Sequence, residues 1–135
     1  MTEQKEQEIS SSDASTAVKT ILIVEDDSGI GEFFFEAIKQ ETPYQALLAT
    51  DGYQALKMVH DVKPSLFLLD YGLPRMNGLE LYDRLHTTEE LEDIPALLIS
   101  AHCPWDEARR RKITCMRKPI ELDDLLQTID SLITC

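Results

Sequence analysis

Residues 21–27 read ILIVEDD, four consecutive apolar residues followed by three acids. A strand that is apolar at every position is typical of a parallel sheet with helices on both faces, and we expect this run to form the central strand. Residues 65–70, SLFLLD, repeat the pattern and end in Asp70. Around these two runs, short apolar stretches alternate with amphipathic ones, which is the pattern of successive β-α units.

The remaining elements follow the same alternation. Further strands are predicted at residues 44–50, 94–100 and 113–117, and further helices at residues 53–62 and from Leu79 and Leu122 onward. Residues 105–112 are predicted to be a short helical or irregular piece. Helical spacing relates five apolar residues that we expect on the sheet-facing side of the first helix: Ile30, Phe33, Phe34, Ala37 and Ile38. Five β-α units with right-handed crossovers predict an α/β fold with a doubly wound, five-stranded parallel sheet of order 2-1-3-4-5.

The length of 135 residues suits one domain. Residues 1–18 are rich in Ser, Thr, Glu and Gln, so we expect a disordered, acidic and polar tail there and a folded domain over residues 19–135. The formal net charge of −12 disfavours binding to nucleic acids or anionic membranes. The chain has neither the apolar run of about 20 residues that a membrane span needs nor the apolar stretch of a secretory signal. We therefore expect a cytoplasmic protein without a membrane partner.

The three cysteines, Cys103, Cys115 and Cys135, show neither a CxxC motif nor the spacing of zinc ligands. Their odd number suits a reducing compartment. We expect all three to be reduced thiols.

Acids stand at the ends of two predicted strands. Glu25 and Asp26 end the first strand, and Asp70 ends the third. In a sheet of order 2-1-3-4-5, the ligand crevice lies where the carboxyl ends of these two strands meet, so the three carboxylates should converge there. Carboxylates with open coordination positions suit Mg²⁺, which usually binds through one or two carboxylates together with a phosphate.

Two further polar residues are expected at the same edge of the sheet. Ser100 ends the predicted fourth strand and Lys118 follows the fifth, which brings a hydroxyl and an ammonium to the acids. A single strand-end acid is usually a helix cap, and a single lysine is usually a solvated charge. Together with the three acids, however, these residues supply what phosphoryl transfer requires, because positioning and charge neutralisation carry most of that catalysis.

At this point the chain resembles the response regulator receiver family, the single-domain CheY-like proteins of two-component signalling. The resemblance covers residues 20–134 and rests on four motifs in the family's order: ILIVEDD, LLDYGLPRMNG, LLISA and MRKP. It implies a CheY-like, flavodoxin-like fold for the domain.

The resemblance also implies roles for the acids. Asp70 would be the nucleophile that accepts a phosphoryl group from a phosphohistidine of a sensor histidine kinase or a histidine phosphotransfer protein. Asp26 would bind Mg²⁺ directly, Glu25 would act mostly through metal-bound water, and the backbone carbonyl of Gly72 would be a further ligand. Such a protein catalyses its own phosphorylation and dephosphorylation and is no enzyme in the ordinary sense.

The fourth and fifth strands carry the rest of the implied site. Ser100 would hydrogen-bond one phosphoryl oxygen and Lys118 would pair with another, with a cis peptide bond before Pro119. The stretch from Ser100 to Lys118 is about one helical turn shorter than in similar receivers, so we expect a shortened fourth helix. Cys115 stands where the family usually has an aromatic switch residue. We therefore expect an output surface that differs from the usual one.

Three functions remain open at this stage. The first is a stand-alone receiver that signals through contact with a downstream protein, with an oligomeric state that the sequence leaves open. The second is a receiver-like interaction module that is not phosphorylated, and the third is a Mg²⁺-dependent phosphatase. The basic run at residues 109–112, RRRK, is either a solvated surface or a docking patch for an acidic partner.

Overall fold

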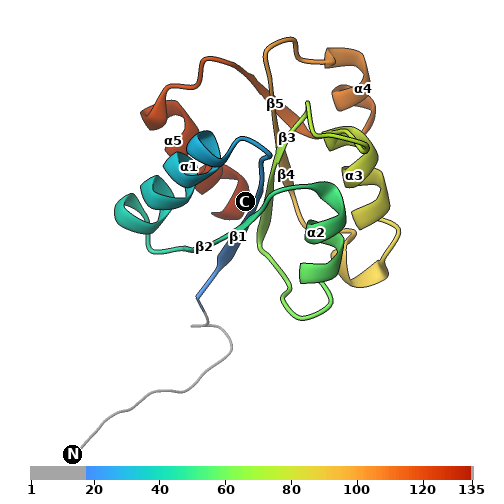
Figure 1. Cartoon of the computed structure of the whole chain (residues 1–135), viewed down its shortest axis with the longest axis horizontal. Helices are drawn as coiled ribbons and strands as arrows, with labels where there is room; N and C mark the ends of the chain where they lie inside the picture. Colours follow the sequence, from blue (N-terminus) through green and yellow to red (C-terminus); the bar gives the residue numbers. More distant parts are fainter. Residues whose placement is uncertain (1–17, 135) are drawn as a thin grey trace, which may run out of the picture.

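The computed structural model describes residues 18–134, so the predicted tail, apart from Val18, and Cys135 lie outside the described residues. Five parallel strands form one sheet in the order β2-β1-β3-β4-β5, which confirms the predicted fold class (Figure 1). The strands are β1 (Thr20–Val24), β2 (Gln45–Ala49), β3 (Leu66–Asp70), β4 (Ala96–Ser100) and β5 (Thr114–Arg117). The prediction of the central strand was wrong, because β3 and not β1 lies in the middle of this order.

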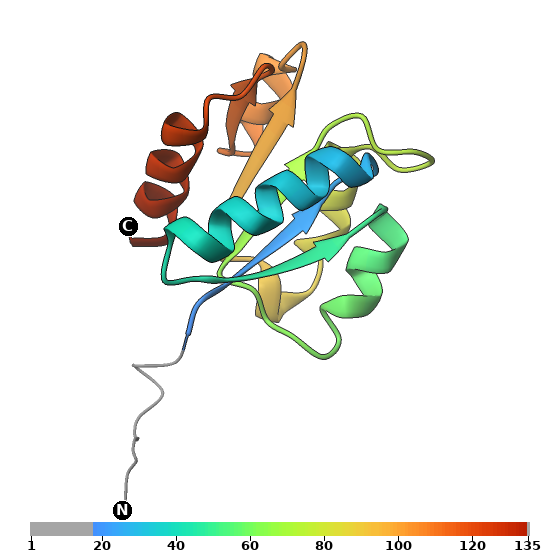
Figure 2. The same ribbon diagram turned by 60° about the vertical axis from the view of Figure 1, so that its left-hand side comes forward.

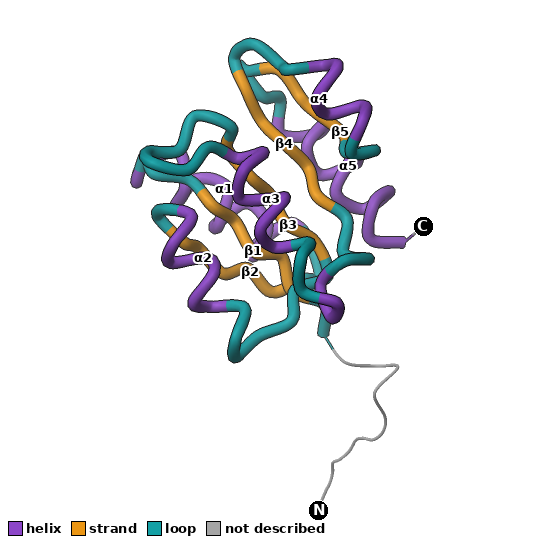
Figure 3. Tube along the Cα trace, turned by 90° about the vertical axis from the view of Figure 1, so that its right-hand side faces the viewer, coloured by secondary structure: helices purple, strands orange, loops and turns teal. Residues whose placement is uncertain are grey.

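Helices cover both faces of the sheet. They are α1 (Ser28–Glu41), α2 (Gly52–Met58), α3 (Gly78–Leu85), α4 (Trp105–Arg110) and α5 (Leu122–Thr134), with a short 3-10 helix, η3, at Glu89–Leu91. Helices α1 and α5 lie on one face and the other helices on the opposite face (Figures 1 and 2). Figure 3 shows α2 and α3 side by side in front of the strands. No helix within residues 18–134 is long and apolar enough to span a membrane.

Strand β1 shows why both faces of the sheet are apolar. All residues of β1 are buried. Ile21 and Ile23 pack with Phe34 and Ile38 of α1, whereas Leu22 and Val24 belong to the core on the other face. Successive side chains of a strand point to opposite faces, so a strand covered on both sides needs apolar residues at every position.

The predicted buried face of α1 was partly wrong. Ile30 and Phe33 are 37% and 54% exposed, whereas Gly31 and Phe34 are buried. A Cβ added to Gly31 would lie 3.1 Å from Leu48 Cδ1 in β2, so the first turn of α1 packs closely on the sheet through a glycine. A count of large apolar residues cannot detect such a contact.

Helices α2 and α4 are both short. Helix α2 ends at Met58, so the predicted extension to residue 62 was wrong, and the residues that follow form turns. Helix α4 has only six residues, as its short segment predicts.

The prediction of three reduced thiols was wrong for two of them. Cys103 and Cys115 form a disulfide bond, with their Cα atoms 6.1 Å apart, a separation within the usual range for disulfides. Cys103 lies in the loop after β4, and Cys115 lies in β5 opposite Leu98 of β4. The β4–β5 register therefore brings together two residues whose sequence spacing matches no disulfide or metal motif.

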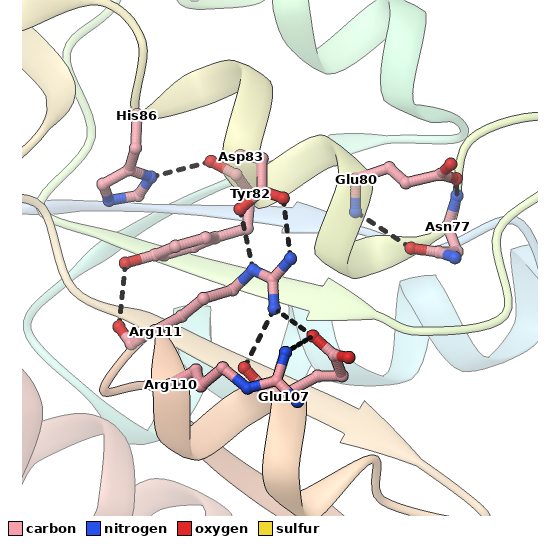
Figure 4. Close-up of polar contacts among 8 residues, drawn as sticks. All are labelled: Asn77, Glu80, Tyr82, Asp83, His86, Glu107, Arg110 and Arg111. Carbon is pink, nitrogen blue, oxygen red and sulfur yellow. Dashed lines mark hydrogen bonds and ion pairs between the residues drawn. The ribbon is translucent and has the colours of Figure 1, made fainter.

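The arginines of the basic run form ion pairs with acidic side chains of the same domain. Arg111 donates from Nε and Nη2 to the two carboxylate oxygens of Asp83 in α3, at 2.7 and 2.8 Å, and from Nη1 to Glu107 Oε1 at 2.9 Å (Figure 4). Arg110 also binds Glu107, at 3.1 Å, and Arg109 lies 3.8 Å from an acid of the same helix, Asp106. The three arginines are thus paired within the domain, which favours a structural role over a docking patch.

Candidate functional site

Three carboxylates meet at the carboxyl end of the sheet. Glu25 and Asp26 follow β1, Asp70 ends β3, and one oxygen of each lies within 4.8 Å of the others. Glu25 and Asp70 are buried and Asp26 is exposed. The next acid, Asp27, serves the fold, because its side chain accepts a hydrogen bond from the Ile30 backbone N–H and caps α1.

Lys118 brings a positive charge to this cluster. Its Nζ lies 2.8 Å from Asp70 Oδ1, and the Lys118–Pro119 peptide bond is cis. Burial lowers the pKa of Lys118, but the hydrogen bond and the negative charge of Asp70 outweigh burial and raise the pKa above its ordinary value. The side chain therefore remains an ammonium at neutral pH.

The buried position of Glu25 disfavours its charged form. Burial raises the pKa of Glu25 to about 7, the backbone N–H of Asp27 opposes this shift, and the charge of Asp70 adds to it. Glu25 Oε2 accepts a hydrogen bond from that N–H at 3.2 Å, but the buried Oε1 has no partner among the described residues. Three carboxylates with an unpaired, buried oxygen fit a hard divalent cation, which binds oxygen ligands.

Ser100 and Gly72 lie beside Asp70. With Asp70 and Lys118 they line an open cleft of about 320 Å³, together with Tyr71, Ala101 and His102. The buried Ser100 donates its hydroxyl proton to the His102 carbonyl oxygen at 2.9 Å and accepts from the His102 N–H at 3.2 Å. A Cβ on Gly72 would lie 3.7 Å from Asp70 Oδ2, so this glycine faces the carboxylate.

Gly78 positions the loop after Asp70. A Cβ at Gly78 would lie 2.6 Å from the Asp70 carbonyl oxygen and 2.8 Å from Leu98 Cδ1, so only glycine fits at this point. Its N–H donates to the Tyr71 carbonyl at 2.9 Å. In the sequence, Asn77 and Gly78 indicate only a turn before a helix, and the close approach to the strand end becomes visible only in the structure.

The arrangement is suited to a phosphoryl group. A carboxylate that can act as a nucleophile faces an open cleft, an ammonium and a hydroxyl lie beside it, and two more acids can hold a cation. The residues predicted to form the site all lie at this end of the sheet: Glu25, Asp26, Asp70, Gly72, Ser100 and Lys118. Among the residues that line the cleft, His102 was not expected to contact Ser100, because that contact depends on the conformation of a loop.

Comparison with known proteins gives a consistent result. The sequence profile of the response regulator receiver domain matches residues 21–130. The polar-differentiation response regulator DivK of Brucella suis is 32% identical over 117 residues, which cover 84% of this chain and 94% of DivK. DivK of Brucella anthropi is 31% identical over the same length, with the same coverage.

Solved structures share the fold. The Vibrio cholerae chemotaxis protein CheY4 superposes with a TM-score of 0.80 and 22% identity, covering 86% of this chain and 99% of that protein. A putative response regulator from Chloroflexus aurantiacus also gives 0.80, with 20% identity and coverage of 88% and 100%. Because the profile spans most of the chain and the relatives align over nearly their whole length, the chain belongs to the response regulator receiver domain family of two-component signalling.

Proposed function

We propose that this receiver accepts a phosphoryl group on Asp70 from a phosphohistidine of a sensor histidine kinase or a histidine phosphotransfer protein, in a reaction that requires Mg²⁺. The observation that carries the proposal is the geometry around Asp70. Its carboxylate lies at an open cleft, 2.8 Å from the ammonium of Lys118 and within 4.8 Å of two further acids.

The chemistry is a displacement at phosphorus. An Asp70 carboxylate oxygen attacks the phosphorus atom, the P–N bond to the donor imidazole breaks, and its electron pair stays on the ring nitrogen. The product is an acyl phosphate, and attack by water later releases inorganic phosphate and restores the carboxylate. Both steps need stabilisation of the negative charge on the phosphoryl oxygens.

Several residues around Asp70 stabilise the negative charge on the phosphoryl oxygens. Lys118, which pairs with Asp70 before the reaction, turns to a phosphoryl oxygen once Asp70 has lost its charge. Ser100 donates its hydroxyl proton to a second phosphoryl oxygen in place of the His102 carbonyl. Asp26, Asp70 and the Gly72 carbonyl would hold a bound Mg²⁺, with Glu25 acting through metal-bound water. That ion would neutralise charge on the phosphoryl group.

We further propose the biological setting that the sequence favours. The domain that the structure describes acts as a receiver in the cytoplasm. The net charge of −12 supports output through a downstream protein and not through nucleic acid or membrane. The short α4 supports an output surface specific to this chain.

Intact mass after incubation with acetyl phosphate and Mg²⁺ tests the proposal. We expect one adduct of about 80 Da on wild type, the mass of a phosphoryl group bound to a nucleophilic carboxylate. Asp70→Asn and a sample with a chelator should both lack it. If wild type remains unmodified under conditions in which it binds Mg²⁺, the proposal is wrong.

A second candidate is an interaction module that is not phosphorylated. The observation that favours it is the environment of Ser100, whose hydroxyl already has both a donor and an acceptor in its own loop. The same mass measurement separates the two functions, because an interaction module that is not phosphorylated gains no adduct from acetyl phosphate and Mg²⁺.

A further inference from the structure

The Cys103–Cys115 disulfide joins the two segments that carry Ser100 and Lys118. Cys103 lies in the loop at residues 101–104, which follows Ser100, and Cys115 lies in β5 shortly before Lys118. A backbone hydrogen bond from Lys118 N to Ser100 O, 2.9 Å long, already connects the same two segments at the site. The loop is therefore held to β5 at both of its ends.

This loop contains the groups that must change when Ser100 binds an oxygen in the cleft. The Ser100 hydroxyl proton is directed at the His102 carbonyl, 2.9 Å away. If the proton turns to a phosphoryl oxygen, that carbonyl loses its partner and is left close to a second acceptor, which is unfavourable. The loop can relieve this conflict by moving. While the disulfide is intact, however, Cys103 cannot move away from Cys115 in β5.

Cys103 is also connected to the start of α4 by a backbone hydrogen bond. The Trp105 N–H, at the first residue of α4, donates to the Cys103 carbonyl at 2.9 Å. A displacement of Cys103 would therefore move both the loop beside the site and the first turn of α4. The far end of α4 is held separately, because Arg111 binds Asp83 of α3.

Two observations favour a reversible bond over a permanent structural one. Cys103 and Cys115 are each only half-buried, so thiol reagents can approach them. The domain also has an apolar core on each face of the sheet, so it does not depend on a crosslink as very small domains do.

We propose that Cys103 and Cys115 are a thiol–disulfide exchange site that controls the receiver: the oxidised form holds the loop at residues 101–104 and slows phosphorylation of Asp70, and the reduced form releases it. The reductant is a dithiol, either a protein or a small molecule. This inference rests on the proposed function of Asp70.

The exchange balances as follows. A thiolate of the reductant attacks one sulfur of the disulfide, and the other sulfur leaves as a thiolate and takes up a proton. The second thiol of the reductant then resolves the mixed disulfide, so the reductant becomes a disulfide. Two electrons and two protons have passed to Cys103 and Cys115, which become thiols. A disulfide of the same chemical class drives the reverse reaction.

The experiment uses full-length Cys135→Ser, in which only these two thiols remain. One portion is reduced with dithiothreitol and another is oxidised with glutathione disulfide, and alkylation followed by mass measurement verifies two free thiols and none, respectively. Both portions, freed of reagent, then receive acetyl phosphate and Mg²⁺. We expect the reduced form to gain the phosphoryl adduct several-fold faster.

Cys103→Ser/Cys115→Ser in the same background is the matched control. It should gain the phosphoryl adduct at the rate of the reduced form, and treatment with glutathione disulfide should not change that rate. Equal rates for the verified reduced and oxidised forms would overturn the proposal, and so would two alkylatable thiols after oxidation.

Hydrogen exchange separates a failure of this inference from a failure of the proposed function. If neither form becomes phosphorylated, the proposed function is wrong, and the exchange of residues 101–113 then decides the present inference. Faster exchange in the reduced form supports release of the loop, and equal exchange contradicts it.

Discussion

The ion pair between Lys118 and Asp70 is the residue-scale feature on which phosphorylation depends most. Lys118→Ala removes an ammonium that lies 2.8 Å from the nucleophile. We expect the rate of phosphorylation by acetyl phosphate to fall about 100-fold, the loss typical when one charge-stabilising donor is removed from an active site. Mg²⁺ binding, measured by calorimetry, should persist, because the three carboxylates remain. A rate close to that of wild type would show that Lys118 does not contact the phosphoryl group.

The buried carboxyl group of Glu25 gives the stability of the fold a pH dependence. The pKa of Glu25 is raised from 4.5 to about 7 by burial, so the folded protein binds more protons than the unfolded chain between these values. Stability without divalent cations should therefore fall by about 1 to 3 kcal/mol as the pH rises from 4.5 to 7 and change little above that range. Glu25→Gln should lack this decrease. Urea denaturation at several pH values, in the presence of a chelator, measures both proteins, and parallel curves would contradict the prediction.

Gly78 is required by close packing. Gly78→Ala would place a Cβ 2.6 Å from a backbone oxygen of Asp70, and the backbone must move. We expect a loss of about 1 to 3 kcal/mol in the free energy of unfolding, as for other overpacked sites. Gly29→Ala is the matched control, because its Cβ would meet only Asp27 Oδ1, at 3.4 Å. Urea denaturation should show that this variant is as stable as wild type or slightly more stable. Equal losses of stability at the two positions would refute the packing argument.

At the scale of elements, Arg111 holds the end of α4 against α3 through a two-pronged contact with Asp83 (Figure 4). Lysine keeps the charge but cannot form this planar pair of hydrogen bonds. We expect Arg111→Lys to cost about 1 kcal/mol of stability, consistent with the loss of charge-assisted hydrogen bonds at a partly exposed site. Arg109→Lys should have no measurable effect, because Arg109 is 70% exposed and 3.8 Å from its acid. Thermal unfolding of the two variants compares them directly.

The elements also show what sequence patterns can and cannot predict. Wholly apolar strands such as β1 and β3 are recognisable because burial on both faces requires them. The buried face of α1 was misassigned because Gly31, without a side chain, makes a contact that hydrophobic periodicity does not register. The basic run at residues 109–112 left a docking patch open because it stands in an otherwise acidic domain, and the sequence does not reveal the pairing of Arg111 with Asp83 of a distant element, α3.

At the scale of the whole molecule, the strand order brings the site together. Four site residues lie far apart in the chain but at or just after the carboxyl ends of parallel strands: Glu25, Asp70, Ser100 and Lys118. Their convergence could therefore be predicted from the order 2-1-3-4-5. The disulfide could not be predicted in the same way, because it depends on the β4–β5 register and on the conformation of one loop. The same register places Cys115 opposite Leu98, two residues before Ser100 in β4.

Locating the phosphoryl group tests directly whether Asp70 is the phosphorylated residue. Wild type treated with acetyl phosphate and Mg²⁺ is reduced with borohydride, which converts an aspartyl phosphate to homoserine, and the peptides are sequenced by mass spectrometry. We expect homoserine at residue 70, and none in a sample prepared without acetyl phosphate. Homoserine at residue 26 instead, or none at residue 70 in a fully phosphorylated sample, would contradict this expectation.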